Sequence, residues 1–313
     1  MLLSSWLPDV KPSAPAARGR VRKSLRSRDR VRPQMESLED RQLLSTVTVT
    51  SLGDSGPGSL RDAIALAASG DTIVFAPTLF SSTTTSTSTT STAAKGNGNG
   101  KGRVKNPPPP PNTIVLSSGQ LTLAKNLTID GPSTSQLTIT TTATNRIFEV
   151  AQNTTVTLSR MTISKGYSGY GAGVFNQGGL TLDACTVSDN YAIYTGGGIY
   201  NVGTLSTNNS TFSGNQARFG GAIYNAGGMV TIDSTSISGN TAFHSDYPWS
   251  GGDGGGIYNE ANGTVIVRNF SSITGNTSQW YEGQGPDVYN LGTIYRDSTS
   301  TIGLLDGNAA VLI

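Results

Sequence analysis

Residues 196–201 read Gly-Gly-Gly-Ile-Tyr-Asn, residues 220–225 read Gly-Gly-Ala-Ile-Tyr-Asn, and residues 254–259 read Gly-Gly-Gly-Ile-Tyr-Asn. Residues 174–176 (Val-Phe-Asn) and 288–290 (Val-Tyr-Asn) are variants of the same final tripeptide. Neighbouring copies are 24 or 25 residues apart where the repeat is uninterrupted, and 31 or 34 apart where extra residues are inserted. A period in this range predicts a solenoid, in which each repeat stacks on the next.

Each repeat contains three short strand-like segments and leaves no room for a helix. In one repeat they are residues 180–183, 186–188 and 197–201, separated by turn-forming residues. Helical repeat arrays are therefore excluded, and the Leu spacing of leucine-rich repeats is absent. Three strands per turn would build three parallel sheets, with about 4.8 Å between stacked strands. We predict an all-β fold over residues 113–313, a right-handed parallel β-helix of three sheets.

Apolar residues recur at three places in the repeat and are expected to point inward. They are β-branched or bulky, as is typical of buried parallel strands. The three columns are Val156, Leu180, Leu205 and Val230; Ile163, Val187, Phe212, Ile237 and Ile273; and Val174, Ile199, Ile223, Ile257 and Val288.

A recurring asparagine marks a second place in four of the repeats, at positions 190, 215, 240 and 276. Asn tolerates the left-handed backbone conformation of a sharp corner, and its side chain can bond to the next coil. We predict that these residues occupy corners and form an asparagine ladder.

The chain before the repeats divides into three parts. Residues 1–45 hold 10 Lys/Arg and 5 Asp/Glu with little to bury, and are interpreted as a basic, disordered export or targeting segment. Residues 46–79 are predicted to form a capping strand-helix-strand unit. Residues 80–112 are a low-complexity loop of Ser/Thr, then Gly, Asn and Lys, then five prolines.

The predicted capping helix covers Ser59–Ser69. Ser59 followed three residues later by Asp62 is a variant of the capping box. An apolar stripe at helical spacing would cover the open end of the solenoid core. The stripe consists of Leu60, Ala63, Ile64, Ala67 and Ala68.

Composition narrows the function classes. Residues 46–313 hold 12 Lys/Arg and 15 Asp/Glu, so this mildly acidic body gives no reason to expect nucleic acid as a partner. The single cysteine, Cys185, excludes an internal disulfide, and it falls in a column with Met161, Ser210, Thr235 and Ser271. The single histidine, His244, excludes a His-rich zinc site. No apolar run reaches the roughly 18 residues needed for a membrane span, and no pattern indicates a cofactor or a metal site.

Four motifs resemble those of exported bacterial proteins. Gly220-Gly221-Ala222-Ile223 and Phe212-Ser213-Gly214-Asn215 reproduce the "GGAI" and "FxxN" motifs of the polymorphic outer membrane protein repeats. Gly58-Ser59-Leu60-Arg61-Asp62-Ala63 is similar to the "CSLREA" segment that precedes β-helix repeats. Residues 38–44 resemble the "LEPR-x-LL" motif, with Asp40 in place of Pro. These resemblances imply a secreted or cell-surface protein with a structural or adhesive role.

A polysaccharide lyase or glycoside hydrolase is the alternative, because those enzymes also use right-handed β-helices. Hydrolysis of a glycosidic bond usually requires two carboxylates that flank it. The nearest candidates, Asp183 and Asp233, align in one outward column with Ser159, Asn208 and Asn269, and lie two coils apart. The sequence therefore predicts no catalytic residues and no enzymatic activity.

The segments that follow the predicted corners are rich in aromatic residues. They are expected to be loops along one edge, with Tyr167, Tyr170, Tyr191, Tyr194 and Phe219 in the shorter ones. Because insertions into a solenoid often form its binding face, the two longest segments give the predicted ligand site. That site consists of Phe243, Tyr247, Trp249, Trp280 and Tyr281. The expected partner is a polysaccharide or cell-surface glycan.

Two points about these segments stay open. The same rings could simply pack across the loops and hold them in place. Acidic residues of the same segments could bind sugar hydroxyls or a calcium ion. They are Asp246, Asp253, Glu282 and Asp287. A separate aromatic column on the Ile-Tyr-Asn segments is expected to be structural. It consists of Phe175, Tyr200, Tyr224, Tyr258 and Tyr289.

Overall fold

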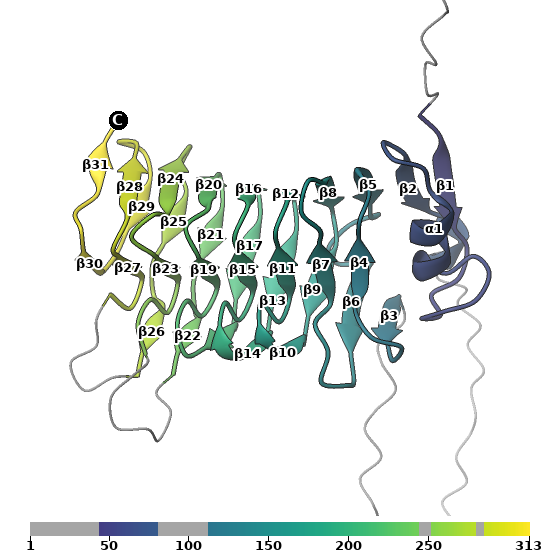
Figure 1. The fold of residues 1–313 in the computed structure, drawn as a ribbon, viewed down its shortest axis with the longest axis horizontal. Helices are drawn as coiled ribbons and strands as arrows, with labels where there is room; N and C mark the ends of the chain where they lie inside the picture. The colour runs from purple at the N-terminus through teal and green to yellow at the C-terminus, as the bar shows by residue number, and fades with distance from the viewer. Residues whose placement is uncertain (1–43, 81–111, 244–251, 280–284) are drawn as a thin grey trace, which may run out of the picture. The chain divides into compact units, whose positions relative to one another are not determined.

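Successive turns of the chain lay their strands side by side in parallel sheets, from the purple to the yellow end of the ribbon (Figure 1). The computed structural model describes residues 44–80, 112–243, 252–279 and 285–313, all within one compact unit. The described residues form four sheets, here called A to D, and every strand pair in them is parallel. The predicted all-β, parallel β-helix is confirmed.

Three of the sheets run the length of the solenoid. Sheet A contains β1 (Thr46–Val49), β2 (Thr72–Phe75), β5 (Leu127–Asp130), β8 (Thr155–Ser159), β12 (Gly179–Asp183), β16 (Thr204–Asn208), β20 (Met229–Asp233), β24 (Thr264–Arg268), β28 (Thr293–Arg296) and β31 (Val311–Leu312). Sheet B contains β3 (Thr113–Leu116), β6 (Thr138–Thr141), β9 (Thr162–Ser164), β13 (Thr186–Ser188), β17 (Thr211–Ser213), β21 (Ser236–Ile237), β25 (Ser272–Ile273) and β29 (Thr301–Ile302). Sheet C contains β4 (Leu121–Leu123), β7 (Phe148–Val150), β11 (Val174–Asn176), β15 (Ile199–Asn201), β19 (Ile223–Asn225), β23 (Ile257–Asn259), β27 (Val288–Asn290) and β30 (Leu305–Gly307).

The fourth sheet corrects the prediction of three sheets with loops between them. Sheet D contains β10 (Tyr167–Tyr170), β14 (Tyr191–Thr195), β18 (Gln216–Ala217), β22 (Thr241–Ala242) and β26 (Thr277–Ser278), along one edge of the solenoid (Figure 1). These segments become strands because each directly follows a corner, with Gly166 before β10 and an asparagine before each of the other four, so their backbones arrive in register. Small inward residues allow the close approach, and three of them, Ala192, Ala217 and Ala242, are fully buried.

The core contains the three predicted apolar columns and a second column from sheet A, which includes Leu158, Leu182, Ile232 and Val267. Register pairs their members rung by rung, as Leu180 with Leu205, Val187 with Phe212 and Ile199 with Ile223. The side chains in these columns are at most 2% exposed. Each of these columns therefore buries one apolar side chain per coil inside the solenoid, away from water.

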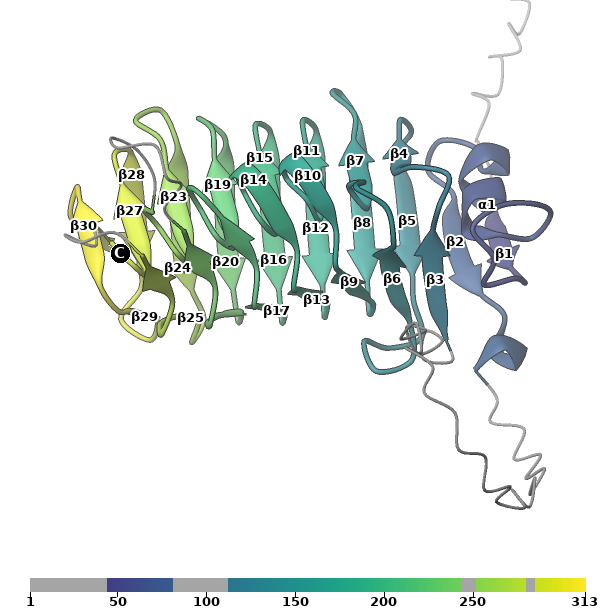
Figure 2. The same ribbon diagram turned by 90° about the horizontal axis from the view of Figure 1, so that it is seen from below.

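The helix α1 (Leu60–Leu66) lies at the β1–β2 end of the solenoid (Figures 1 and 2). The Ser59 side chain accepts a hydrogen bond from the Asp62 amide at 3.1 Å, and the Gly58 amide donates to Asp62 Oδ2 at 2.8 Å. The predicted cap at the start of the helix is confirmed. A short 3₁₀ helix, η1 (Pro77–Leu79), follows β2.

The helix ends three residues before the predicted Ser69, and Ala68 is exposed rather than part of the buried stripe. The reason is a distant side chain. Lys125 Nζ donates hydrogen bonds to the carbonyl oxygens of Ile64, Ala65 and Ala67 at 2.6–3.2 Å. These bonds satisfy carbonyl groups at the end of the helix, so the helix can end there.

Asparagines form two ladders inside the solenoid. In the first, Asn190 Nδ2 donates to Asn215 Oδ1 at 2.9 Å, and the pattern continues through Asn240 and Asn276 to the carboxylate of Asp287. The second ladder was not predicted and uses the Asn that ends each sheet C strand. Its members are Asn176, Asn201, Asn225, Asn259 and Asn290, with Nδ2–Oδ1 distances of 2.7–2.9 Å.

The predicted left-handed conformation of the corner asparagines is wrong. Positive φ belongs instead to the residue before each Asn, which is Asp189, Gly214, Gly239 or Gly275. The Asn side chain must point inward to reach the next rung, so the preceding residue makes the bend.

A turn also explains why the first residue of each Gly-Gly motif is glycine. Gly220 has φ +63°, and a Cβ there would lie 2.4 Å from the Ile223 carbonyl oxygen. Only a residue without a side chain fits this corner without rearrangement.

Candidate functional site

The outer face of sheet D carries a stack of aromatic rings. The Tyr167 and Tyr191 ring centroids are 5.4 Å apart with planes at 13°, and Tyr191 and Phe243 are 5.1 Å apart at 10°. Both faces of the Tyr191 ring are therefore covered. A flat ligand can stack only on Tyr167 or Phe243, whose rings end the stack.

A second group of rings lies further along the same strands and is more exposed. Tyr170 and Tyr194 are 47% and 45% exposed, and their centroids are 5.3 Å apart at 37°. Tyr170 also meets Tyr200 of sheet C edge-to-face at 5.8 Å. We call Tyr167, Tyr170, Tyr191, Tyr194, Phe219 and Phe243 the aromatic edge.

The aromatic column of sheet C has a different environment. Tyr200, Tyr224 and Tyr258 stack at 5.0–5.3 Å with planes within 9°, and the register pairs them directly. The Tyr224 hydroxyl donates to Glu260 Oε1. Burial, followed by this hydrogen bond, holds the pKa of Tyr224 above its ordinary value, and burial raises the pKa of Tyr258 to about 12. These continuous stacks fit the expected structural role of the column.

Of the five predicted ligand residues, Phe243 lies in the described part of the chain. It follows β22 directly, is half-buried, and covers one face of Tyr191. Tyr247, Trp249, Trp280 and Tyr281 lie outside the described residues, as do Asp246 and Glu282.

The two acidic residues of these segments that the structure describes have different surroundings. Asp287 is 4% exposed and accepts hydrogen bonds from Asn276 and the Leu304 amide, so it belongs to the ladder and is not available to a ligand. Asp253 is half-buried, and burial, then the charge of Asp306, raises its pKa. Among the described residues, no three His, Cys, Asp or Glu side chains come together as a metal site.

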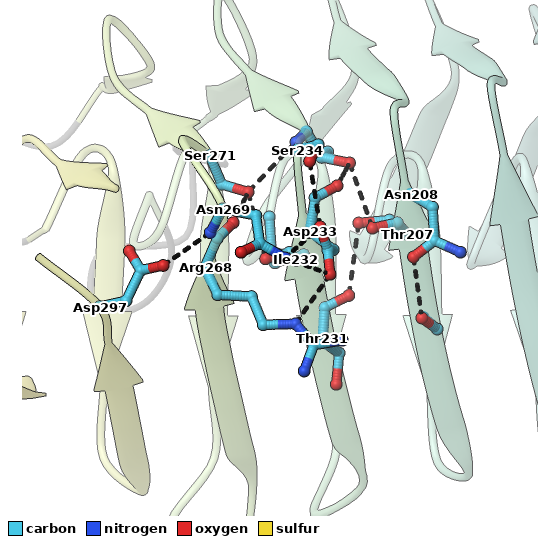
Figure 3. A network of polar contacts seen from close by, with 12 residues as sticks. Thr207, Asn208, Thr231, Ile232, Asp233, Ser234, Arg268, Asn269, Ser271 and Asp297 are labelled. Carbon is cyan, nitrogen blue, oxygen red and sulfur yellow. Dashed lines mark hydrogen bonds and ion pairs between the residues drawn. The ribbon is translucent and has the colours of Figure 1, made fainter. Parts of the chain in front are cut away.

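Asp183 and Asp233 lie in a polar outward row on sheet A. Figure 3 shows Asp233 of this row with Asn208, Arg268 and Asn269. Asn208 lies between the two aspartates in register. Asp233 receives hydrogen bonds from Arg268 Nε at 2.8 Å and from Asn269 Nδ2 at 2.9 Å. Burial alone would raise the pKa of Asp233, but these hydrogen bonds outweigh it and lower the pKa. Asp233 is therefore an ion-paired surface carboxylate.

One alignment in that column was wrong. Register places Arg268, not Asn269, opposite Asp233. The corner in this coil contains two residues of positive φ, Asn269 and Phe270, where the preceding coil has only Ser234. The extra corner residue moved the sequence alignment by one position, from Arg268 to Asn269.

Cys185 belongs to a ladder of buried hydroxyls. Its amide donates to Ser210 Oγ at 3.1 Å, and the Ser210 amide donates to Thr235 Oγ1 at 3.2 Å. The thiol contacts the Leu158 carbonyl oxygen at 3.2 Å, and burial raises its pKa to about 11. The sulfur replaces one hydroxyl of a structural column, as the alignment with Ser210 and Thr235 predicted.

Sequence reasoning missed sheet D, although a signal for it was present. Each corner Asn is followed by one polar or aromatic residue and then by Ala or Ser, as in Tyr191-Ala192, Gln216-Ala217 and Thr241-Ala242. This alternation is a two-residue strand pattern that repeats in register.

Comparison with known families connects the repeats to polymorphic membrane proteins. The family model of the Chlamydia polymorphic membrane protein repeat matches residues 209–226 and 234–260. A search of the curated proteins finds no match to this chain. Within the described residues, no helix has the length and apolar character needed to cross a membrane. The predicted similarity to polymorphic outer membrane protein repeats is thus confirmed over two stretches of the parallel β-helix.

Proposed function

We propose that this chain is an exported structural or adhesive protein of the cell surface or the extracellular space. The match to a repeat of polymorphic membrane proteins supports this assignment. A solenoid with continuous columns and two asparagine ladders is a rigid support on which side chains are held at fixed spacing. In this proposal residues 1–45 serve export, and residues 80–112 form a loop between two coils.

The proposed ligand is a polysaccharide or cell-surface glycan, bound along the aromatic edge. The observation that supports it is the Tyr167–Tyr191–Phe243 stack, because its last ring immediately precedes the insertion at residues 244–251. Sugar rings have one apolar face that packs on an aromatic ring. The proposed contact residues are Phe243, Tyr247, Trp249, Trp280 and Tyr281.

We propose that this protein does not catalyse a reaction on its ligand. Asp183 and Asp233 are separated by Asn208, and Asp233 is already bound by Arg268. A screen for sugar release from acidic polysaccharides tests the alternative of a lyase or hydrolase. Release that survives purification and is lost in Asp183→Asn or Asp233→Asn would establish the enzyme instead.

The adhesive proposal is tested on a glycan array with the full chain and the variants Phe243→Ala and Tyr194→Ala. We expect array binding to fall about tenfold in each, as for loss of a central aromatic contact, with little change in melting temperature. Tyr295→Ala is the matched control, because Tyr295 is a half-buried tyrosine on sheet A, away from the edge.

The outcomes separate binding from packing. If the rings only hold the edge together, Phe243→Ala lowers the melting temperature and leaves the affinity of the folded protein unchanged. Equal losses of binding in Tyr295→Ala and Tyr194→Ala would contradict a site at the aromatic edge.

A further inference from the structure

A cavity of about 400 Å³ lies where the end of β2 meets the corner between sheets A and B. It is far from the aromatic edge in the sequence and belongs to other sheets. Its size is within the range of small-ligand sites. It is lined by Val74, Phe75, Pro77, Phe80, Asp130, Gly131, Pro132, Gln136 and Arg160.

One part of the lining is apolar and rigid. Phe75 and Phe80 meet edge-to-face, with centroids 6.3 Å apart and planes at 67°. Pro77 and Pro132 add two further rings that have little conformational freedom. This part offers flat apolar surface at low entropic cost to a ligand.

The other part is polar and held in a fixed geometry. Arg160 Nε and Nη2 donate to Asp130 Oδ1 and Oδ2 at 2.9 and 2.6 Å, across two successive coils. Arg160 has a positive φ of +55°, an uncommon conformation for a residue with a side chain. The Asp130 and Arg160 side chains stay 31% and 51% exposed, so the pair is open to solvent. Gln136 adds an exposed amide.

The corner at Gly131 leaves no room for a side chain, and a hydrogen bond holds its backbone to the next coil. A Cβ on Gly131 would lie 2.6 Å from the Arg160 carbonyl oxygen, and the Gly131 amide donates to Ser159 O at 2.9 Å. The ion pair and the aromatic wall are therefore positioned before any ligand arrives, which lowers the cost of binding.

We propose that this cavity binds a single pyranose ring. A carboxylate that accepts and a guanidinium that donates can together hold two neighbouring hydroxyls, and the amide of Gln136 can bind a third. The apolar face of the ring packs on Phe80, since Phe75 is only 8% exposed and supports Phe80 from the core. A charged ligand fits less well, because the Asp130 and Arg160 charges already neutralise each other. This site does not depend on glycan binding at the aromatic edge.

Saturation-transfer NMR on the full chain tests the proposal, with methyl glucoside, galactoside, mannoside and N-acetylglucosaminide as probes. We expect at least one of them to bind with a Kd on the order of millimolar, with the strongest transfer to protons of one ring face. Mannitol is a linear polyol that carries neighbouring hydroxyls but no ring, and it is expected to give no transfer.

Variants locate the binding site. Asp130→Asn and Gln136→Ala should each weaken binding, the first by about tenfold for one charge-assisted hydrogen bond. The matched control is Asp233→Asn, which removes an equivalent Asp–Arg pair from the same outward column of sheet A and should leave binding unchanged. Thermal melts confirm that each variant is folded.

Three results would overturn the site: no transfer from any methyl glycoside, equal transfer from mannitol, or unchanged binding in both cavity variants. Loss of the same signal in Tyr194→Ala would instead assign the sugar to the aromatic edge. Failure of the glycan-array proposal leaves this test unaffected, because the cavity residues Asp130 and Gln136 are not part of the aromatic edge.

Discussion

Sheets C and D both display aromatic side chains, yet the two faces are built differently. In sheet C the ring column stands on buried Val and Ile and is flanked by an asparagine ladder. In sheet D the inward residues are mainly Ala, and Tyr170 and Tyr194 are almost half exposed. The comparison indicates that continuous stacking on a bulky core serves stability, while rings on a thin, small-residue sheet are available for contact.

The largest expected effect comes from the ladder beneath sheet C. Asn225 is fully buried, accepts from Asn201 and donates to Asn259 Oδ1 and the Gly228 carbonyl. Asn225→Ala leaves buried polar groups unpaired, and we expect it to lower the free energy of unfolding by about 3 kcal/mol. Chemical denaturation of the full chain measures this change.

Asn208→Ala is the control, since Asn208 points outward on sheet A. It should change the free energy of unfolding by about 0.5 kcal/mol or less. Equal effects of the two substitutions would show that the ladder adds nothing beyond ordinary surface contacts.

The next prediction compares the stability that is lost when one aromatic ring is removed from sheet C or from sheet D. Tyr224 is stacked on both sides and hydrogen-bonded to Glu260, so Tyr224→Ala should cost about 2 kcal/mol of stability. Tyr194→Ala should cost about 0.5 kcal/mol or less because that ring is largely exposed. A larger stability loss in Tyr194→Ala would remove the distinction between the two sheets.

The smallest expected effect is the pH dependence of the stability that the sheet C tyrosines contribute. Burial raises the pKa of Tyr258 to about 12 in the folded chain, against 10.0 for the ordinary side chain. The folded state then holds its proton more tightly than the unfolded state between these values. Stability from this phenol is complete below pH 10 and is lost as the pH rises toward 12.

Denaturation curves across that interval measure this loss, and phenolate absorbance follows the titration. Tyr258→Phe should reduce the slope of stability against pH, because the substituted ring carries no proton to lose. An unchanged slope would mean that the loss arises elsewhere, for example at Tyr224, whose pKa is also raised.

Much of the fold could be predicted because a solenoid repeats its environment. Ile199 and Ile223 occupy the same place in successive coils, so their spacing in the sequence already gives their pairing in space. The same logic predicted the ladder through Asn215 and Asn240. It failed at Asn269, where a corner of two residues replaced one and shifted the register. The proposed contacts at Phe243 and in the neighbouring segments remain predictions, because insertions have no repeat to align with.

The sequence by itself determined the parallel β-helix, its inward columns and the cap at Ser59, because each depends on local spacing and residue type. Tertiary structure decided what local pattern does not contain. Register between coils turned the aromatic segments into sheet D, and Lys125 ended α1 from the next coil. Asp130 and Arg160 form a bidentate pair beside Phe75 and Phe80 because stacking brings residues of different coils to one corner. Contacts between residues so far apart in the chain form only when successive coils stack. The sequence of a single repeat does not specify this stacking.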